Sequence, residues 1–227
     1  MNKKKLLFSL NFNIAIVVLT IIALGIAVID VQIMDTQYVM MLKYFTTLSN
    51  LFLCVAAIIM IVYESLILAG KTKVVPKWVN IVKLSANVST TITFMVVLFF
   101  LLPMAYIREN PGYSPAFLFI NSNLIFHLLN PLLGMISFLL FDNDQRQIKL
   151  PQTLFALIFV VCYEIFYTLD VFLKFMPGDH DWYGFTLFGE QFIPLVLILF
   201  LGLTFLLSWL FWLGNKKIHI LEKTATK

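Results

Sequence analysis

The sequence predicts an all-α protein that spans a membrane as a bundle of six helices. Three observations lead to this fold class. Apolar residues make up 61% of the 227 residues and charged residues only 12%, whereas an ordinary soluble domain carries about 25% charged residues. The mean hydropathy is +0.94. Finally, the apolar residues gather in runs long enough to cross the hydrocarbon core of a bilayer, which takes about 20 helical residues.

The predicted spans follow one another with short connections. They cover residues 11–30, 40–63, 83–103, 117–140, 152–174 and 191–213. The first run follows lysines but lacks a good cleavage site, so we expect a span here rather than a secretory signal. No connection is long enough to hold a further domain, and residues 1–227 are expected to form one domain.

Turn and charge signals separate these spans in order. Lysines and a proline divide the second span from the third, and prolines with a glycine divide the third from the fourth. Acidic residues end the fourth span, a proline opens the fifth, and a polar turn precedes the sixth. The residues concerned are Lys71, Lys73, Pro76 and Lys77; Pro103, Pro111, Gly112 and Pro115; Asp142, Asn143, Asp144 and Pro151; and Pro177, Gly178, Asp179, His180 and Asp181.

The formal net charge of +4 indicates topology rather than a nucleic-acid partner. Thirteen of the sixteen basic residues fall on the side of the amino terminus, and only Lys43, Arg108 and Lys174 fall on the other. Cytoplasmic segments carry such an excess, so both termini are predicted to be cytoplasmic. Lys outnumbers Arg fourteen to two, a bias that suggests a bacterial source and therefore the bacterial plasma membrane. Cys54 and Cys162 lie inside apolar runs and are expected to be buried and structural.

Polar residues inside the spans are costly and usually face a bundle interior or a wet cavity. In the second and fourth spans they recur at three- and four-residue steps and so share one helical face, and the fifth span adds a further group. These are Lys43, Thr46, Thr47, Asn50 and Cys54 in the second span, Asn123, His127 and Asn130 in the fourth, and Tyr163, Glu164, Tyr167, Thr168 and Asp170 in the fifth. By helical rise, Thr46 and His127 are expected roughly 10–15 Å below the outer surface. Structural roles remain open, because such threonines often bond to a carbonyl one turn away and asparagines join helices.

Metal and cofactor chemistry finds no support in the sequence. His127 is the one histidine inside a predicted span, whereas a bis-histidine haem needs two facing imidazoles. Zinc-ligand spacings, phosphate-binding glycine loops and the nucleophile-elbow motif are absent from the sequence. We therefore expect no metal and no cofactor.

Two stretches resemble a known family. They are residues 43–50 (KYFTTLSN) and 123–131 (NLIFHLLNP). Together they resemble the androgen-induced-protein family of multispanning membrane proteins and its small bacterial six-helix relatives. The resemblance covers the six-span layout, although the motifs themselves total fewer than twenty residues. The eukaryotic members are threonine hydrolases that cleave fatty acid esters of hydroxy fatty acids.

The resemblance implies a hydrolase whose substrate is a membrane lipid or acyl chain, with no obligate protein partner. The lysine-x-x-threonine pattern falls on Thr46, with Thr47 as the alternative nucleophile, and the histidine pattern falls on His127. The chemistry is compatible, because a weak hydroxyl nucleophile needs a base within hydrogen-bond reach. Asn50, Asn123 or Asn130 could bind the oxyanion, and Glu164 or Asp170 could orient the imidazole.

Two other classes of function fit the same sequence. Size and topology also suit a ligand-binding or transport protein, such as the six-helix substrate-capture subunit of a vitamin importer. A non-catalytic membrane scaffold with a packed polar core is the third possibility. A cavity that reaches both Thr46 and His127 would favour the hydrolase over the scaffold.

Overall fold

The computed structural model describes residues 3–33, 39–107, 115–142, 148–176 and 178–225, and within these ranges it contains helices and no strand. Six helices in the described residues are long and apolar enough to cross a membrane. They run over Lys3–Asp30, Phe45–Leu68, Lys77–Tyr106, Asn121–Phe141, Leu150–Leu173 and Glu190–Ile218. The predicted fold class, an all-α bundle with six apolar spans, is confirmed.

The α-helices are interrupted and extended by short segments of other helical types. In chain order the α-helices are α1 (Lys3–Ile33), α2 (Val39–Leu42), α3 (Phe45–Leu68), α4 (Lys77–Val96), α5 (Leu102–Ile107), α6 (Asn121–Leu124), α7 (Asn130–Ile136), α8 (Ala156–Leu173) and α9 (Ile193–Ala225). The π-helical segments are Val97–Leu101, Ile125–Leu129 and Ser137–Phe141, and the 3-10 helices are Pro115–Phe119, Leu150–Phe155, Phe185–Phe188 and Glu190–Phe192.

The helix ends differ from the predicted spans because hydropathy marks the hydrocarbon-compatible stretch and not the whole helix. The helix of the third span, α4, begins at Lys77 rather than at residue 83. It follows directly after Pro76, which has the extended backbone of an N-cap. The second predicted span is divided: α2 ends at Leu42, and α3 begins at Phe45 after a break. Thr46 therefore lies in the first turn of α3, and Lys43 precedes that helix instead of sharing a face with it.

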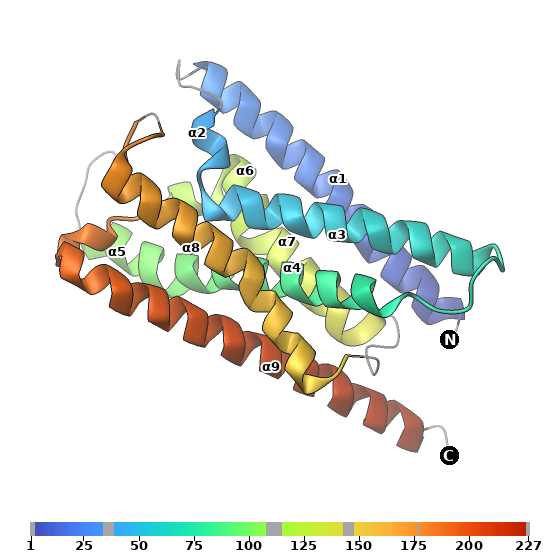
Figure 1. Ribbon diagram of the computed structural model, residues 1–227. Coiled ribbons are helices and arrows are strands. Elements are labelled where there is room, and N and C mark those ends of the chain that lie inside the picture. Colours follow the sequence, from blue (N-terminus) through green and yellow to red (C-terminus); the bar gives the residue numbers. More distant parts are fainter. Residues whose placement is uncertain (1–2, 34–38, 108–114, 143–147, 177, 226–227) are drawn as a thin grey trace.

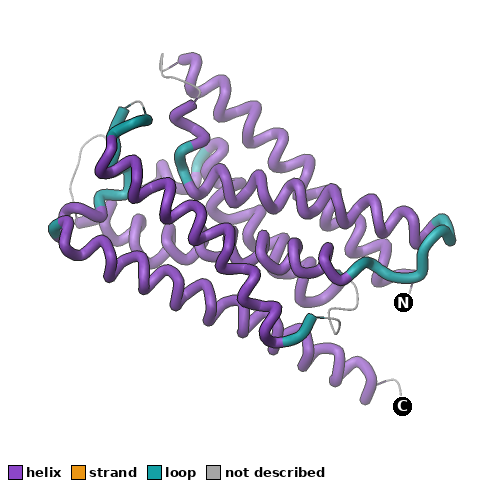
Figure 2. Tube along the Cα trace, in the orientation of Figure 1, coloured by secondary structure: helices purple, strands orange, loops and turns teal. Residues whose placement is uncertain are grey.

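Helix α4 occupies the centre of the bundle (Figure 1). It packs against α3, α7, α8 and α9. Helix α1 packs on α3, α6 and α7 at one side, whereas α8 and α9 pack together at the other. Both chain termini lie at the same end of the bundle (Figure 1), and the tube view shows that loops are confined to the helix ends (Figure 2).

The central helix is rich in small polar residues, and this composition allows close packing between helices. Its hydroxyls bond to carbonyls one turn earlier: Ser85 to Ile81 at 3.0 Å, Ser89 to Ser85 at 2.9 Å, and Thr91 to Asn87 at 2.7 Å. These bonds satisfy polar groups that have no water available in the interior. The helix can therefore carry hydroxyls at the core of the bundle without unpaired donors at these positions.

Large apolar side chains cover the outside of the bundle, as a lipid-facing surface requires. Ile21, Phe99 and Ile198 are examples of exposed residues of this kind. The expectation for Cys54 is confirmed, since it is buried. The expectation for Cys162 is wrong, because it is exposed on the outer face of α8. An apolar run alone cannot tell a core-facing cysteine from a lipid-facing one.

Pro131 explains the π-helical segment Ile125–Leu129. Proline has no N–H to give to the carbonyl four residues earlier, which here belongs to His127. The helix compensates by widening, and the N–H of Asn130 bonds to the carbonyl of Ile125, five residues back. Such π-bulges are often found at functional sites. His127 lies in the middle of this one.

Gly134 marks a close approach of α7 to α3 and α4. A Cβ at this position would overlap Asn87 Oδ1 and lie 3.3 Å from Leu53 Cδ2. Asn87 is held by its bond to the Lys83 carbonyl at 2.8 Å. We therefore expect Gly134→Ala to lower the free energy of unfolding by about 1–2 kcal/mol, since overpacking outweighs the better helix propensity of alanine.

A matched control for this prediction is Gly25→Ala, because a Cβ there meets nothing within 4 Å. The measurement is the thermal unfolding midpoint of the two purified variants in one detergent. Gly25→Ala should keep or slightly raise the midpoint of the unmodified chain, because alanine is the better helix former, while Gly134→Ala lowers it. Equal midpoints for the two variants would contradict the packing argument.

Candidate functional site

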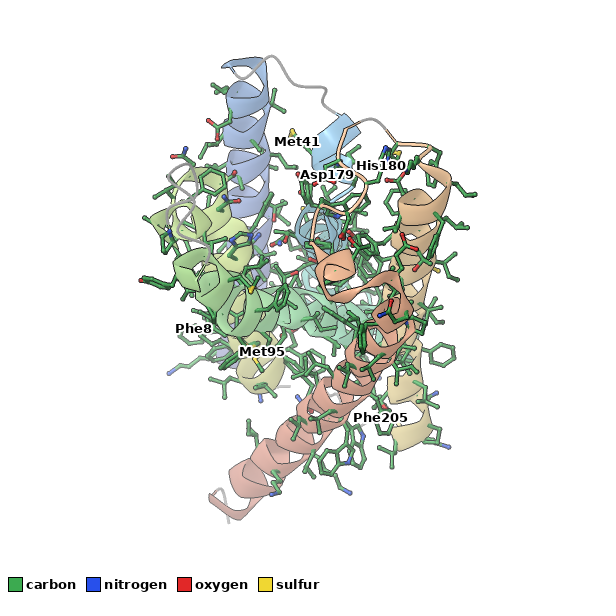
Figure 3. The ribbon with its side chains drawn as sticks, turned by 90° about the vertical axis from the view of Figure 1, so that its left-hand side faces the viewer. Phe8, Met41, Met95, Asp179, His180 and Phe205 are labelled. Carbon is green, nitrogen blue, oxygen red and sulfur yellow. The ribbon has the colours of Figure 1, made fainter. Side chains whose placement is uncertain are left out.

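A cavity of about 340 Å³ lies where the start of α3 meets residues 117–127 and the loop after α8. Its lining includes Thr46, Thr47, His127 and Asn123, which the sequence singled out, together with the aromatic rings of Tyr44, Phe117, Phe126, Trp182 and Tyr183. The cavity is at the end of the bundle opposite the termini. Figure 3 shows its lining residue Met41 close to Asp179 and His180 at that end. The size suits a small-molecule site, for which about 300–1,000 Å³ is usual.

Thr46 and Thr47 are the first candidates for chemistry in this cavity. Thr46 is partly exposed and Thr47 is buried, with 7% of its surface accessible. Within the described ranges neither hydroxyl has a hydrogen-bond partner. By contrast, Thr20 bonds to the Ile16 carbonyl and Thr204 to the Phe200 carbonyl, each at 2.7 Å. Thr20 and Thr204 thus make the bond to a carbonyl one turn earlier that is usual for an intramembrane threonine, whereas Thr46 and Thr47 do not.

His127 is oriented by a backbone carbonyl. Its Nδ1 lies 2.7 Å from the carbonyl oxygen of Leu118. A carbonyl can only accept a hydrogen bond, so Nδ1 carries the hydrogen. In the neutral ring this leaves Nε2 with its lone pair free to act as an acceptor. Because the imidazole is 93% buried and lines the cavity, the arrangement supplies a fixed, unprotonated nitrogen at its wall.

The first turn of α3 also brings backbone donors to the site. The first N–H groups of a helix lack partners within it. The N–H of Phe45 is satisfied by the hydroxyls of Tyr163 at 3.0 Å and Tyr183 at 2.8 Å, and that of Leu48 by the Tyr44 carbonyl at 3.1 Å. The N–H groups of Thr46 and Thr47 have no such acceptor in the described part of the chain.

Asn50 and Asn130 form a structural network below the cavity. Asn50 Nδ2 donates to the carbonyls of Thr46 at 2.8 Å and Phe126 at 3.1 Å. Asn130 Nδ2 donates to the Thr20 hydroxyl at 2.9 Å and to Asn50 Oδ1 at 3.0 Å. Each amide has two N–H groups and uses both. These bonds join α1, α3 and α7 and leave neither amide a spare donor for an oxyanion.

Asn123 lines the cavity and uses only one of its two amide N–H groups in a bond within the protein. Its Nδ2 donates to the Phe117 carbonyl at 3.0 Å, and the side chain is partly exposed. One N–H of this amide is therefore uncommitted. Of the three asparagines, Asn123 is the one that the structure places at the cavity with a donor to spare.

A second, apolar cavity adjoins the first and shares Thr46, Leu101 and Tyr183 with it. It has a volume of about 50 Å³. Its other lining residues are mostly large and apolar: Phe45, Val96, Val97, Val160, Leu197, Phe200 and neighbouring aromatic residues. Thr46 therefore stands at the boundary between a polar cavity and an apolar one.

The two acidic residues considered as partners of the imidazole lie elsewhere. Glu164 lines the apolar cavity, and Asp170 bonds to His180 Nδ1 at 3.1 Å and to the N–H of Met176 at 2.7 Å. The contact that orients His127 comes instead from Leu118. A carboxylate is a frequent partner of a catalytic histidine, but a backbone carbonyl can orient the ring in the same way. Because every residue has a backbone carbonyl, the sequence does not reveal which one is used.

The loop after α8 closes the outer wall of the cavity with aromatic residues. Trp182 and Tyr183 line it, and Lys43 Nζ lies 4.8 Å from the Trp182 ring centre and donates to the Asp179 carbonyl at 2.6 Å. Burial raises the pKa of Tyr183 to about 12, so its hydroxyl stays neutral. In the sequence, the neighbouring aromatic residues Trp182 and Tyr183 in the turn before the sixth span indicate this wall. The polar pattern did not include them.

Asp181 fixes the shape of this loop. Burial on its own raises the pKa of Asp181, but hydrogen bonds from the Thr186 hydroxyl and from Tyr167 outweigh it. The N–H groups of Phe185 and Thr186 also donate to this carboxylate, both at 2.9 Å. The pKa is therefore lowered overall, and Asp181 stays ionised at neutral pH as the acceptor that holds the turn.

Among the residues that the structure describes, no group of three or more His, Cys, Asp and Glu side chains is placed to hold a metal ion. The cavity thus offers hydroxyls, an imidazole, an amide and backbone N–H groups as its chemistry. Comparison of the chain with protein-family models, with curated proteins and with solved structures found no match.

Proposed function

We propose that the protein is an intramembrane hydrolase that cleaves a lipid ester, with Thr46 as nucleophile and His127 as general base. The observation that carries this proposal is the shared cavity, whose lining includes an unbonded threonine hydroxyl and an oriented imidazole. The His127 ring and the Thr46 hydroxyl are not bonded to each other in the structure. Binding of substrate would bring them within the hydrogen-bond reach that activation of a hydroxyl nucleophile requires. Thr47, also in the cavity, is the alternative nucleophile.

The reaction would run in two stages. His127 Nε2 takes the hydroxyl proton as Thr46 Oγ attacks the ester carbonyl, and the tetrahedral intermediate then breaks its bond to the alcohol oxygen. The imidazolium gives its proton to this leaving alcohol, and an acyl-threonine remains. Water then attacks the acyl carbon while Nε2 takes its proton. The fatty acid leaves, and Thr46 Oγ recovers its hydrogen from the imidazolium.

The negative charge that develops on the carbonyl oxygen needs donors already in place. The uncommitted N–H groups of Thr46 and Thr47 are at the amino end of a 24-residue helix, where the helix dipole favours negative charge. Asn123 adds a side-chain N–H at the same cavity. These donors replace Asn50 and Asn130, whose N–H groups are used within the network.

An acyl chain is the substrate that suits the surroundings of Thr46. The adjoining apolar cavity of about 50 Å³ would receive the first carbons of a hydrocarbon chain beside the reacting carbonyl, and the bundle surface is apolar. We further propose that the protein lies in a bacterial plasma membrane with both termini in the cytoplasm, as the basic residues favour. The cavity would then open toward the outer leaflet.

A fluorophosphonate probe tests the nucleophile directly, because it forms a stable bond with an activated hydroxyl. We expect the probe to label the purified full-length chain at Thr46, as located by mass spectrometry. Thr46→Ala should abolish the label, and Thr204→Ala, which removes a carbonyl-bonded hydroxyl outside the cavity, should keep it. A label that survives Thr46→Ala and is lost in Thr47→Ala would move the nucleophile to Thr47.

Absence of any label, with no release of fatty acid from esters in mixed micelles, would count against a hydrolase. If a water-soluble molecule then co-purified in the cavity, the ligand-binding alternative would replace it. An acyl chain retained in the cavity without turnover would also favour binding over catalysis.

A further inference from the structure

A second polar centre is buried at the end of the bundle that carries both termini. It comprises Ser9 and Asn13 on α1, Glu64 on α3, Lys83 on α4 and Asp142 after the fourth span. Each of these five side chains is at most 1% exposed. Figure 3 shows Phe8, the neighbour of Ser9, far from Met41 and Asp179 at the cavity end. This centre is separate from the proposed hydrolase site and independent of it.

The contacts of the Ser9 hydroxyl show how many protons the two neighbouring carboxyl groups hold. Its Oγ is within hydrogen-bond distance of Glu64 Oε1 and lies 2.9 Å from Asp142 Oδ1. A hydroxyl has one hydrogen and can donate it to only one of the two carboxyl groups. The other contact is favourable only if that carboxyl group carries a hydrogen and donates it to Ser9 Oγ. The geometry therefore requires one proton shared within the pair Glu64 and Asp142.

Lys83 indicates which carboxyl group holds the proton. Its Nζ donates to Asn13 Oδ1 at 2.5 Å and lies 3.9 Å from Asp142 Oδ2. Asp142 Oδ1 also accepts a bond from the Ser137 hydroxyl at 2.5 Å. An ammonium and two hydroxyl donors stabilise an ionised Asp142. The proton then belongs to Glu64, whose O–H donates to Ser9 as Ser9 donates to Asp142.

Charge balance leads to the same number of bound protons. The charged groups that act on Glu64 are Asp142 and Lys83, while Lys5, one turn before Ser9 on α1, is partly exposed and outside the buried set. Two carboxylates with one ammonium would bury an uncompensated negative charge, which is very costly in an apolar interior. One bound proton makes the centre neutral.

Buried atoms without partners occur within this centre and about one turn before it on α4. Asp142 Oδ2 has no hydrogen-bond partner among the described residues. The same holds for both amide atoms of Asn80, which precedes Lys83 by three residues on the same face of α4 and is 1% exposed. Unsatisfied buried polar atoms are rare and call for an explanation. A site that binds and releases a small charged ligand has unsatisfied polar atoms in either its bound or its free state.

We propose that Glu64, Ser9 and Asp142 form a binding site for one exchangeable proton, taken from the aqueous phase at the end of the bundle that carries the termini. The bound proton completes the chain of hydrogen bonds from α3 through α1 to the end of the fourth span. Its release leaves two ionised carboxyl groups facing one hydroxyl, which weakens the contact of α1 with α3.

Infrared spectroscopy of the purified full-length chain tests the site, because a protonated carboxyl group has a C=O band that a carboxylate lacks. At about pH 7 we expect such a band, and it should shift when the glutamates carry ¹³C in their carboxyl groups. Glu64→Gln should remove the component of the band that arises in this centre, while Glu190→Gln, a control at an exposed position, should leave the band unchanged. The labelled, unmodified chain keeps the test valid even if a variant does not fold.

The pH dependence of unfolding gives a second readout. The folded chain holds one proton more than the unfolded chain at neutral pH. The free energy of unfolding should therefore fall as pH rises above about 4.3, the ordinary pKa of glutamate, and level off once the folded site has also lost its proton. Glu64→Gln keeps a neutral donor to Ser9 and should lose this dependence. A protonated-carboxyl band unaffected by Glu64→Gln, or stabilisation by Na⁺ at constant pH and ionic strength in place of the proton dependence, would overturn the proposal.

Discussion

Replacing His127 with asparagine is expected to lower the rate of lipid-ester hydrolysis by about 10²–10⁴-fold, the usual contribution of a general acid–base group. The choice of asparagine follows from the geometry. The hydrogen bond at 2.7 Å runs from Nδ1 to the Leu118 carbonyl, and an asparagine Nδ2 sits at nearly the same place and can donate the same bond. The variant therefore keeps the structural contact and removes Nε2, the nitrogen proposed to act as the base.

The measurement is the initial rate of fatty acid release from an ester in mixed micelles, together with the thermal unfolding midpoint of each variant. His180→Asn is the matched control, since His180 lies outside the cavity and bonds to Asp170. It should retain the rate of the unmodified chain. A His127→Asn protein that folds and hydrolyses at the original rate would exclude His127 as the base.

The sequence predicted the spans well because the hydrocarbon core selects for apolar residues over a fixed length. It could not predict where α3 begins. That boundary depends on Tyr163 and Tyr183, which bind the N–H of Phe45 from positions more than a hundred residues away. For this reason Thr46 was expected deep within a continuous span, whereas the structure places it in the first turn of a helix.

The candidate site was predicted in part. Polar periodicity brought attention to Thr46, Thr47, Asn123 and His127, and all four line one cavity. Periodicity gives a helical face but not the partner across it. Asn50 and Asn130 therefore looked like site residues, although they bond to each other at 3.0 Å. Leu118 contributes only a backbone carbonyl, so no property of its side chain could have indicated its role.

The buried charged centre was missed for a related reason. Glu64, Lys83 and Asp142 fall at the margins of the predicted spans, which end at 63, begin at 83 and end at 140. Margins are where charged residues usually reach water, and Lys83 was counted there as a topology signal. The helices extend past these margins, and the three side chains turn inward. The burial of these side chains follows from the packing of α1, α3 and α4, which the sequence alone does not give.

Replacing Lys83 with methionine is expected to lower the free energy of unfolding by about 3–5 kcal/mol, as removal of one partner from a buried ion pair does. Methionine is apolar and similar in length, so it fills the space of the lysine stem. The variant leaves Asp142 without its counter-charge at 3.9 Å and Asn13 Oδ1 without its donor at 2.5 Å. Unfolding by SDS in mixed micelles, followed by tryptophan fluorescence, measures this loss.

The double variant Lys83→Met with Asp142→Asn distinguishes the ion pair from simple packing. Asparagine is close in shape to aspartate and carries no charge, so the buried centre becomes neutral again. We expect the double variant to be more stable than Lys83→Met alone, because the cost of an unpaired buried charge is gone while the polar contacts of the side-chain oxygen remain. If Asp142→Asn instead lowered stability by the same amount in the presence and absence of Lys83, the two residues would be energetically independent. The loss in Lys83→Met would then be assigned to its contact with Asn13.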